Sequence, residues 1–360
     1  MIKKVLTAIL CLTLVLTLGG CSLSSRPTSV DADSEAPTSS KEEPVVKSYI
    51  NPLTGIDNLS EDTIDRRPVA IMVNNITQAQ KVQTGLGGAD IVYETEVEGG
   101  VTRLMAVFKD FSKASQVGTI RSARYPYVDL ALGHDAIYVH CGQDPTYCKP
   151  HLNDIDDLSI DTNSPGAKRI KNGLATEHTL YVFPEKLWPA LASKFKSTVK
   201  NNSWQNFAKE DETVTLTGGR ADRVTVPFPI LKTVFDYDKT TGLYTRLSQN
   251  KVLKDYVTGK PITVKNVFVL MTNIADYPDH YHRKVDLVGG AGYYVTNGTY
   301  TKIKWQKGSS TSPIKITDES GKEIKVSAGN SWVCIANTAT CKPVMESAEP
   351  TTTTSTPSNP

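Results

Sequence analysis

The sequence predicts an α+β protein, in which an N-terminal mixed α/β domain precedes a smaller strand-rich domain. In the first half, apolar strand-like runs alternate with helical segments, whereas the second half holds β-rich runs separated by turn signals. Both ends are rich in Ser, Thr and Pro and poor in large apolar residues, so we expect them to stay disordered. The 360 residues suffice for two domains with such extensions.

The first residues have the pattern of a secretory leader. Lys3 and Lys4 precede an apolar run that is shorter than the roughly 20 residues of a membrane span. The run ends in Leu-Gly-Gly-Cys, which resembles the lipobox of bacterial lipoproteins. We therefore predict that residues 1–20 are removed and that Cys21 is lipidated, which anchors the chain at the extracytoplasmic face of the cell membrane. An ordinary signal peptide and an uncleaved anchor are the alternatives.

Composition divides the remaining chain into four segments. We expect a disordered linker at 21–48, the N-terminal domain at 49–205, the strand-rich domain at 220–344 and a Thr/Pro-rich tail at 345–360.

The first domain is predicted to mix strands and helices. Stretch 68–74 is mostly apolar, as a buried strand is, and Gly99-Gly100 between two β-rich runs indicates a two-residue hairpin turn. The spacing of apolar residues predicts two helices. In chain order, we expect strands at 68–74, 91–98, 101–108 and 136–140, and helices at 125–132 and 185–200.

The second domain is predicted to consist of strands and hairpins, because its runs are rich in β-branched and aromatic residues. Asn297-Gly298 is a strong type I′ turn signal, and residues 319–321 indicate another turn. Before these hairpins, we expect strands at 223–228, 233–237, 242–247 and 267–271.

Several long stretches together resemble one family. They are RRPVAIMVNN, GADIVYETEVEGGVTRLMAVF, GTIRSARYPYVDLAL and DAIYVHCG in the first half, and GAGYYVTNGTYTKIKWQK and GKEIKVSAGNSWVCIAN in the second. The chain resembles the YerB-type bacterial lipoproteins from Asn51 to Asn337. The resemblance implies a lipid anchor and two fused α+β domains of unknown function. Cys141 and Cys148 depart from the small residues that are usual there.

Three glutamates alternate along one predicted strand and should share a face: Glu94, Glu96 and Glu98. A two-residue turn would place Glu96 opposite Arg103. The carboxylates form either a solvated or arginine-paired surface, or a catalytic cluster in which Glu96 or Glu98 is a general acid.

Two arginines and two histidines are candidate binding residues. Arg121 and Arg124 lie three residues apart, and guanidinium groups suit either the glutamates or an anionic ligand. His140 ends a predicted strand; it and His178 are either satisfied structural residues or general acid–bases. If the clusters meet, these four residues and Arg103 line one polar cleft.

A D-x-x-D-H-x-H motif at 276–282 could place two histidines on one strand face, which suits a metal, but it is also typical of a polar loop. No CxxC or HExxH spacing occurs. We predict no metal and no other cofactor; a metal-dependent hydrolase using Asp279, His280 and His282 is the weakest alternative.

Six cysteines are too few for a disulfide scaffold. Cys11 leaves with the leader and Cys21 carries the lipid. In an oxidising compartment, two local disulfides are the simplest expectation, although other pairings and free thiols stay open. The disulfide candidates are Cys141, Cys148, Cys334 and Cys341.

Charge excludes one class of partner. The 40 basic and 38 acidic residues nearly balance, and the leader holds the two excess lysines, so we expect no nucleic-acid ligand. The leading hypothesis is a membrane-anchored envelope lipoprotein that binds a wall glycan, a peptide or an envelope protein. The alternative is a peptidoglycan glycoside hydrolase or lytic transglycosylase that uses the glutamates.

Overall fold

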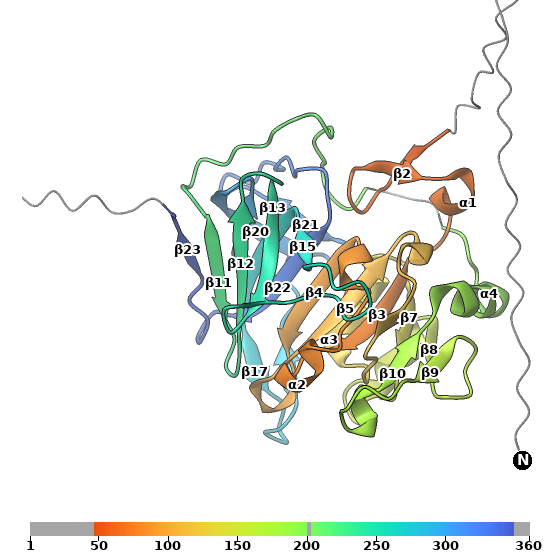
Figure 1. Cartoon of the computed structure of the whole chain (residues 1–360). Helices are drawn as coiled ribbons and strands as arrows, with labels where there is room; N and C mark the ends of the chain where they lie inside the picture. Colours follow the sequence, from red (N-terminus) through yellow and green to blue (C-terminus); the bar gives the residue numbers. More distant parts are fainter. Residues whose placement is uncertain (1–46, 200–202, 349–360) are drawn as a thin grey trace, which may run out of the picture. The chain divides into compact units, whose positions relative to one another are not determined.

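A ten-stranded mixed sheet runs through the chain (Figure 1). The structure is a computed structural model and describes residues 47–199 and 203–348. We call the first range the N-terminal half and the second the C-terminal half. Within them the fold is strand-rich with few helices. In sheet order, the strands are β21 (Ile314–Thr317), β20 (Thr299–Lys307), β19 (Gly289–Thr296), β16 (Asn266–Thr272), β22 (Ser331–Asn337), β4 (Ile91–Glu96), β5 (Thr102–Phe108), β3 (Val69–Asn74), β7 (Ile137–His140) and β8 (Asp157–Ser159).

The two halves meet in the middle of this sheet. Strand β22 of the C-terminal half lies parallel to β4 of the N-terminal half, from Ser331 opposite Ile91 to Ile335 opposite Thr95. Every residue of both strands is buried. The two halves are therefore joined at this point by a continuous ladder of backbone hydrogen bonds.

A second sheet covers one face of the large sheet, and its apolar residues share one core with that face. Its strands run in the order β14 (Lys251–Val252), β13 (Leu243–Ser248), β12 (Lys232–Asp238), β11 (Arg223–Pro227) and β23 (Val344–Glu346), with β15 (Thr263–Val264) also paired to β13. A three-stranded sheet joins the same core: β6 (Val117–Gly118), β10 (Leu180–Val182) and β9 (Ala167–Arg169). The small pairs are β1 (Tyr49–Ile50) with β2 (Asp57–Leu59), and β17 (Ile274–Asp276) with β18 (Arg283–Val285).

Helices also pack against the two faces of the large sheet. Helix α3 (Tyr125–Leu132) has the predicted bounds and packs its apolar side on a second core, which lies on the other face of the large sheet. Helix α4 (Pro184–Lys194) ends earlier than predicted, because the chain after it is drawn into pairing with 65–67: Arg67 N donates to Ser197 O at 2.7 Å. Helices α1 (Glu61–Ile64) and α2 (Thr77–Gln80) are single turns. Short 3₁₀ turns are η1 (Leu86–Gly88), η2 (Glu98–Gly100), η3 (Phe111–Lys113), η4 (Lys149–Asp154) and η5 (Thr176–His178).

The described residues include no helix that is both long and apolar enough to cross a membrane. The predicted leader, the lipidation site at Cys21 and most of the predicted linker and tail lie outside the described residues.

The hairpin between β4 and β5 exists, but its predicted register is wrong by one residue. Its loop has three residues, Glu98–Gly100, and Val97 N donates to Val101 O at 2.8 Å. Both glycines have positive φ, 65° and 72°, which suits a turn followed by a left-handed residue. Glu96 consequently faces Thr102, and Arg103 faces Thr95 on the opposite side of the sheet.

One buried carboxylate ties the two halves together. Glu94 of β4 is fully buried, and its Oε1 accepts hydrogen bonds from Asn75 and Thr102 of its own half and from Thr233 of the other, at 2.8–2.9 Å. Its Oε2 accepts a hydrogen bond from Trp332 Nε1 at 2.9 Å.

A buried guanidinium balances this charge. Arg246 Nη2 lies 3.8 Å from Glu94 Oε2, and neither side chain is exposed. The guanidinium also lies over the rings of Phe235 and Trp332, 5.7 and 5.3 Å from their centroids. The two sheets therefore enclose an ion pair whose partners all lie on strands or next to them.

We predict that Arg246→Met destabilises the protein by about 3–5 kcal/mol, because it leaves the Glu94 carboxylate buried without its counter-charge. Urea unfolding of the compact unit from Val46 onward measures the effect. The matched control is Arg223→Met. It removes a half-exposed ion pair with Asp236 in the second sheet, which also carries Arg246, and should cost about 0–1 kcal/mol. Equal losses in the two variants would show that the buried pair does not link the halves.

Candidate functional site

Two of the predicted glutamates end in a small polar cavity between the halves, which we call the closed cluster. It is lined by Glu96, Glu98, Arg124, Asp144, His282 and Arg283, together with several tyrosines. The stacked rings of Tyr147 and Tyr277, 3.7 Å apart, join the N-terminal half to the hairpin of β17 and β18. The free volume is about 10 Å³, which is room for one water molecule.

The environments of Glu96 and Glu98 shift their pKa values in opposite directions. Burial raises the pKa of Glu96, only partly offset by the charge of Arg283, and Glu96 Oε1 is buried without a hydrogen-bond partner among the described residues. Burial also disfavours ionised Glu98, but the hydrogen bond and charge of Arg124 outweigh it and lower the pKa. Two neighbouring carboxyl groups whose pKa values are shifted in opposite directions form the pattern of a general acid with its partner.

His282 joins three carboxylates. Its Nδ1 lies 2.6 Å from Asp279 Oδ2, its Nε2 lies 3.0 Å from Asp144 Oδ1, and Glu98 Oε1 is 3.7 Å away. The hydrogen bond from His282 lowers the pKa of Asp279 to about 2.

The D-x-x-D-H-x-H motif therefore contributes its last histidine to an ionic cluster. His280 lies exposed in the turn with a positive φ of 53°, away from the face of His282. Across residues 47–199 and 203–348, no group of three Asp, Glu, His or Cys side chains is arranged to hold a metal ion.

The remaining predicted arginines do not share this cavity. Arg103 donates to Ser122 O at 2.8 Å, and burial lowers its pKa to about 10. Arg121 lies 3.5 Å from the carboxylate of Glu177, outside the cluster. Glu94, as described above, is enclosed by the core. The structure thus brings Glu96, Glu98 and Arg124 into one cavity; Arg103 does not line it, although its charge also lowers the pKa of Glu98.

Both predicted histidines have protein partners. His140 is fully buried, with Nδ1 2.8 Å from Gly142 O and Nε2 2.9 Å from Asp157 Oδ2. His178 lies 2.8 Å from the amide of Asn74 and 3.4 Å from Glu177, and burial lowers its pKa. Of the residues expected to line one cleft, Arg103, Arg121, Arg124, His140 and His178, Arg124 lines the closed cluster, and Arg121 and His178 meet at Glu177.

The four cysteines within the described residues are free thiols, in place of the expected local disulfides. Cys141 and Cys148 belong to cores on opposite faces of the large sheet, so they are not placed to bond to each other. Cys334 and Cys341 share one face, both buried. Burial raises the pKa of Cys148 and of Cys341 to about 12, which disfavours the reactive thiolate.

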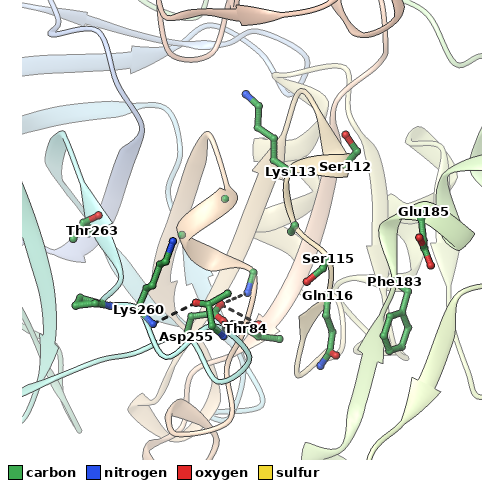
Figure 2. Close-up of a pocket in the computed structure, with 16 residues that line it drawn as sticks. Thr84, Ser112, Lys113, Ser115, Gln116, Phe183, Glu185, Asp255, Lys260 and Thr263 are labelled. Atoms are coloured by element: carbon green, nitrogen blue, oxygen red, sulfur yellow. Dashed lines mark hydrogen bonds between the residues drawn. The ribbon is translucent and has the colours of Figure 1, made fainter. Parts of the chain in front are cut away.

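A larger opening, the main groove, lies elsewhere at the junction of the halves (Figure 2). Its volume is about 860 Å³. The N-terminal half lines it with the glycine-rich segment 84–88, with 112–116 and with Phe183 and Glu185; the C-terminal half contributes residues between 255 and 263. Most of these side chains are hydroxyls, amides or charges, and Phe183 supplies an aromatic ring.

The walls of the main groove are held by a buried aspartate. Asp255 accepts hydrogen bonds from Thr84 Oγ1 at 2.9 Å, from Gly85 N at 2.6 Å and from the backbone of Val257 and Thr258 at 3.1 and 2.9 Å. Its lone pairs are thereby occupied by the protein. A loop of the C-terminal half is thus fastened to the glycine-rich segment of the N-terminal half, which gives the groove a defined shape.

Sequence reasoning missed this groove. Its segments lie far apart in the chain and form no known motif. The available signals were the run Thr-Gly-Leu-Gly-Gly at 84–88 and the polar stretch after Phe111. Gly85 has a φ of 87°, and a Cβ there would lie 2.6 Å from the backbone oxygen of Gln116, so only glycine fits.

The fold and these two sites define a two-domain, strand-rich protein without a recognised catalytic motif. Comparison with known proteins agrees: residues 53–198 match the family described as "Protein of unknown function (DUF3048) N-terminal domain", and residues 224–333 match its C-terminal domain. The chain belongs to the DUF3048 family.

The predicted resemblance to YerB is confirmed by one relative, YerB of Bacillus subtilis, through both its sequence and its crystal structure. The chain is 30% identical to the "Putative lipoprotein YerB" of Bacillus subtilis (strain 168) over 298 residues, which cover 79% of this chain and 85% of the relative. It is also similar to the crystal structure of the YerB protein from Bacillus subtilis, with a TM-score of 0.71 and 27% identity, over 82% of this chain and 99% of that one. The name of this relative agrees with the prediction that the chain is a lipoprotein.

We predict opposite pH effects for two substitutions in the closed cluster. The pKa of Glu96 is raised by folding, so wild type loses stability as pH rises through that pKa, and Glu96→Gln should gain stability relative to wild type. The pKa of Glu98 is lowered, so its contribution is present at neutral pH and lost in acid, and Glu98→Gln should lose stability relative to wild type at neutral pH.

The measurement is urea unfolding of wild type and both variants at about pH 3 and about pH 7. If the stability of both variants relative to wild type changed in the same direction between these two pH values, the two environments described above would be contradicted.

Proposed function

We propose that this protein is a lipid-anchored, extracytoplasmic protein of the bacterial cell envelope that binds a polar wall component, a glycan or a peptide, in the main groove. The observation that supports it is the groove itself: about 860 Å³, lined by hydroxyl, amide and charged side chains from both halves. Binding sites of this size are usually preformed clefts between structural units. The closed cluster, with about 10 Å³, offers no comparable space.

The composition of the groove favours an uncharged or mixed-charge ligand. Its exposed charges are Lys113, Lys260 and Glu185, of both signs, because Asp255 is occupied internally. Hydroxyl groups of Ser112 and Ser115 and the ring of Phe183 would meet hydroxyl-bearing and apolar parts of the same ligand. Sugar rings and short peptides combine such surfaces.

The anchor rests on the N-terminal pattern and on the relative that is named a lipoprotein. A diacylglyceryl group on Cys21 would hold the protein at the outer face of the cell membrane, because two acyl chains anchor a protein stably. The segment between Cys21 and the first strand at Tyr49 would let the folded part reach the wall.

A second candidate function is a peptidoglycan glycoside hydrolase or lytic transglycosylase. It is favoured by the opposite pKa shifts of Glu96 and Glu98. A sugar ring would need the hairpin of β17 and β18 to move away, because it closes the cluster.

We predict that the unit from Val46 onward sediments with purified peptidoglycan and that Gly87→Tyr weakens this binding on the order of tenfold. A Cβ at Gly87 meets nothing within 4 Å, so the ring would fill groove space without disturbing the fold. Glu61→Tyr on exposed α1 is the control for an added ring. Binding that is equal in both variants would rule out the main groove.

The same incubation tests the second candidate. Mass spectrometry would detect muropeptides released by wild type and absent with Glu96→Gln and Glu98→Gln; binding without release would exclude the hydrolase.

We predict that Cys21→Ala in the full chain moves the protein from the membrane fraction to the medium, because the lipid is lost. Immunoblots of the two fractions measure it. Unchanged membrane retention would refute lipidation as the anchor.

A further inference from the structure

One side chain of the main groove has unused hydrogen-bonding capacity. Gln116 is 9% exposed and lines the groove, and within residues 47–199 and 203–348 its side-chain amide has no hydrogen-bond partner. Two other buried amides donate to backbone oxygens: Gln205 Nε2 to Ile314 O at 3.0 Å, and Asn266 Nδ2 to Ser327 O at 2.9 Å. The Gln116 amide atoms are not among the fully buried, unpaired side-chain atoms of the described residues, so they are open to a ligand in the groove.

The position of Gln116 is fixed by its surroundings. It precedes β6, where Val117 and Gly118 pair with Val182 and Tyr181. Its backbone oxygen contacts the glycine-rich segment at Gly85, where any side chain would clash. The backbone that carries Gln116 is therefore in place before a ligand binds, which reduces the entropic cost of binding.

The chemistry of a primary amide selects its partner. The Gln116 side chain offers N–H donors and a carbonyl acceptor in one plane. A carboxylate only accepts and an ammonium group only donates, so each would leave part of the amide unpaired. The N–H and C=O of one trans secondary amide point in opposite directions, but a chain of such groups offers a C=O from one unit and an N–H from the next, which together can satisfy both.

We infer that Gln116 is a specificity-determining residue of the main groove and that it recognises a secondary amide of the bound ligand. This inference rests on the proposed function of the groove. Two sources carry that group in a cell wall, the acetamido group of an amino sugar and the peptide bond. Figure 2 shows Phe183 and Ser115 in the same groove, where a ring and a hydroxyl would contact the remainder of either ligand.

The experiment uses three probes and calorimetric titration of the unit from Val46 onward. The probes are a β-1,4-linked tetramer of N-acetylglucosamine, the glucose tetramer cellotetraose, which carries a hydroxyl in place of each acetamido group, and an N-acetylated tri-alanine peptide. We expect wild type to bind the N-acetyl tetramer or the peptide about tenfold more tightly than cellotetraose, as lost hydrogen bonds imply. Which of the two binds identifies the source of the amide.

Two variants test the residue. Gln116→Met keeps the length of the side chain and removes the amide, so it should lose the preference for amide-bearing probes and bind cellotetraose as wild type does. Gln116→Glu keeps an acceptor but loses the donors, and should show a smaller loss than Gln116→Met. Urea unfolding confirms that each variant is folded.

The outcomes separate the two proposals. If Gln116→Met still prefers the amide-bearing probes as wild type does, the inference is overturned; if it also sediments with peptidoglycan, while Gly87→Tyr does not, the proposed function stands. If wild type binds neither peptidoglycan nor any probe, both proposals fail.

Discussion

The structure depends on a charge that is buried where two halves of the chain meet. Glu94 and Arg246 are both fully enclosed, and their separation from water is tolerated only because Asn75, Thr102, Thr233 and Trp332 hydrogen-bond the carboxylate. These donors come from both halves. Any slip of β22 against β4, or of the small sheet against the large one, would leave a charge unpaired in the core. The relative position of the halves is therefore specified electrostatically as well as by apolar packing, and the main groove and the closed cluster inherit that position.

The local structure could largely be predicted from the sequence. Apolar runs located β3, β5, β7 and β16, and α3 was predicted to the residue. The depth of β4 could not be predicted, because alternating glutamates usually indicate a solvated face, and only its position between β5 and β22 makes Glu94 a core residue. The length of the loop between β4 and β5 was also underestimated by one residue, since two adjacent glycines fit both a two-residue and a three-residue turn.

The candidate site was partly visible from the sequence. Glu96, Glu98 and Arg124 do meet, but charge patterns could not show that Asp144 and His282 close over them. Their charges are largely satisfied by one another, and such a cluster holds the hairpin of β17 and β18 in place. The main groove has a different character, because it has a volume of about 860 Å³ and contains the unpaired amide of Gln116. Thr84 and Asp255, which are hydrogen-bonded across its walls, lie 171 residues apart in the chain and meet only in the folded state.

The parallel pairing of β4 with β22 has a consequence for how the chain acquires its structure. Thr95 and Ile335, which are bonded across this pair, lie 240 residues apart in sequence. A chain that emerges N-terminus first, from a ribosome or through a membrane, exposes one whole edge of β4 until the last central strand has followed. That edge carries apolar residues and unpaired backbone groups, which makes it prone to capture by other strands. Completion of the core must therefore await nearly the entire chain, and factors that shield nascent strands would act in this interval.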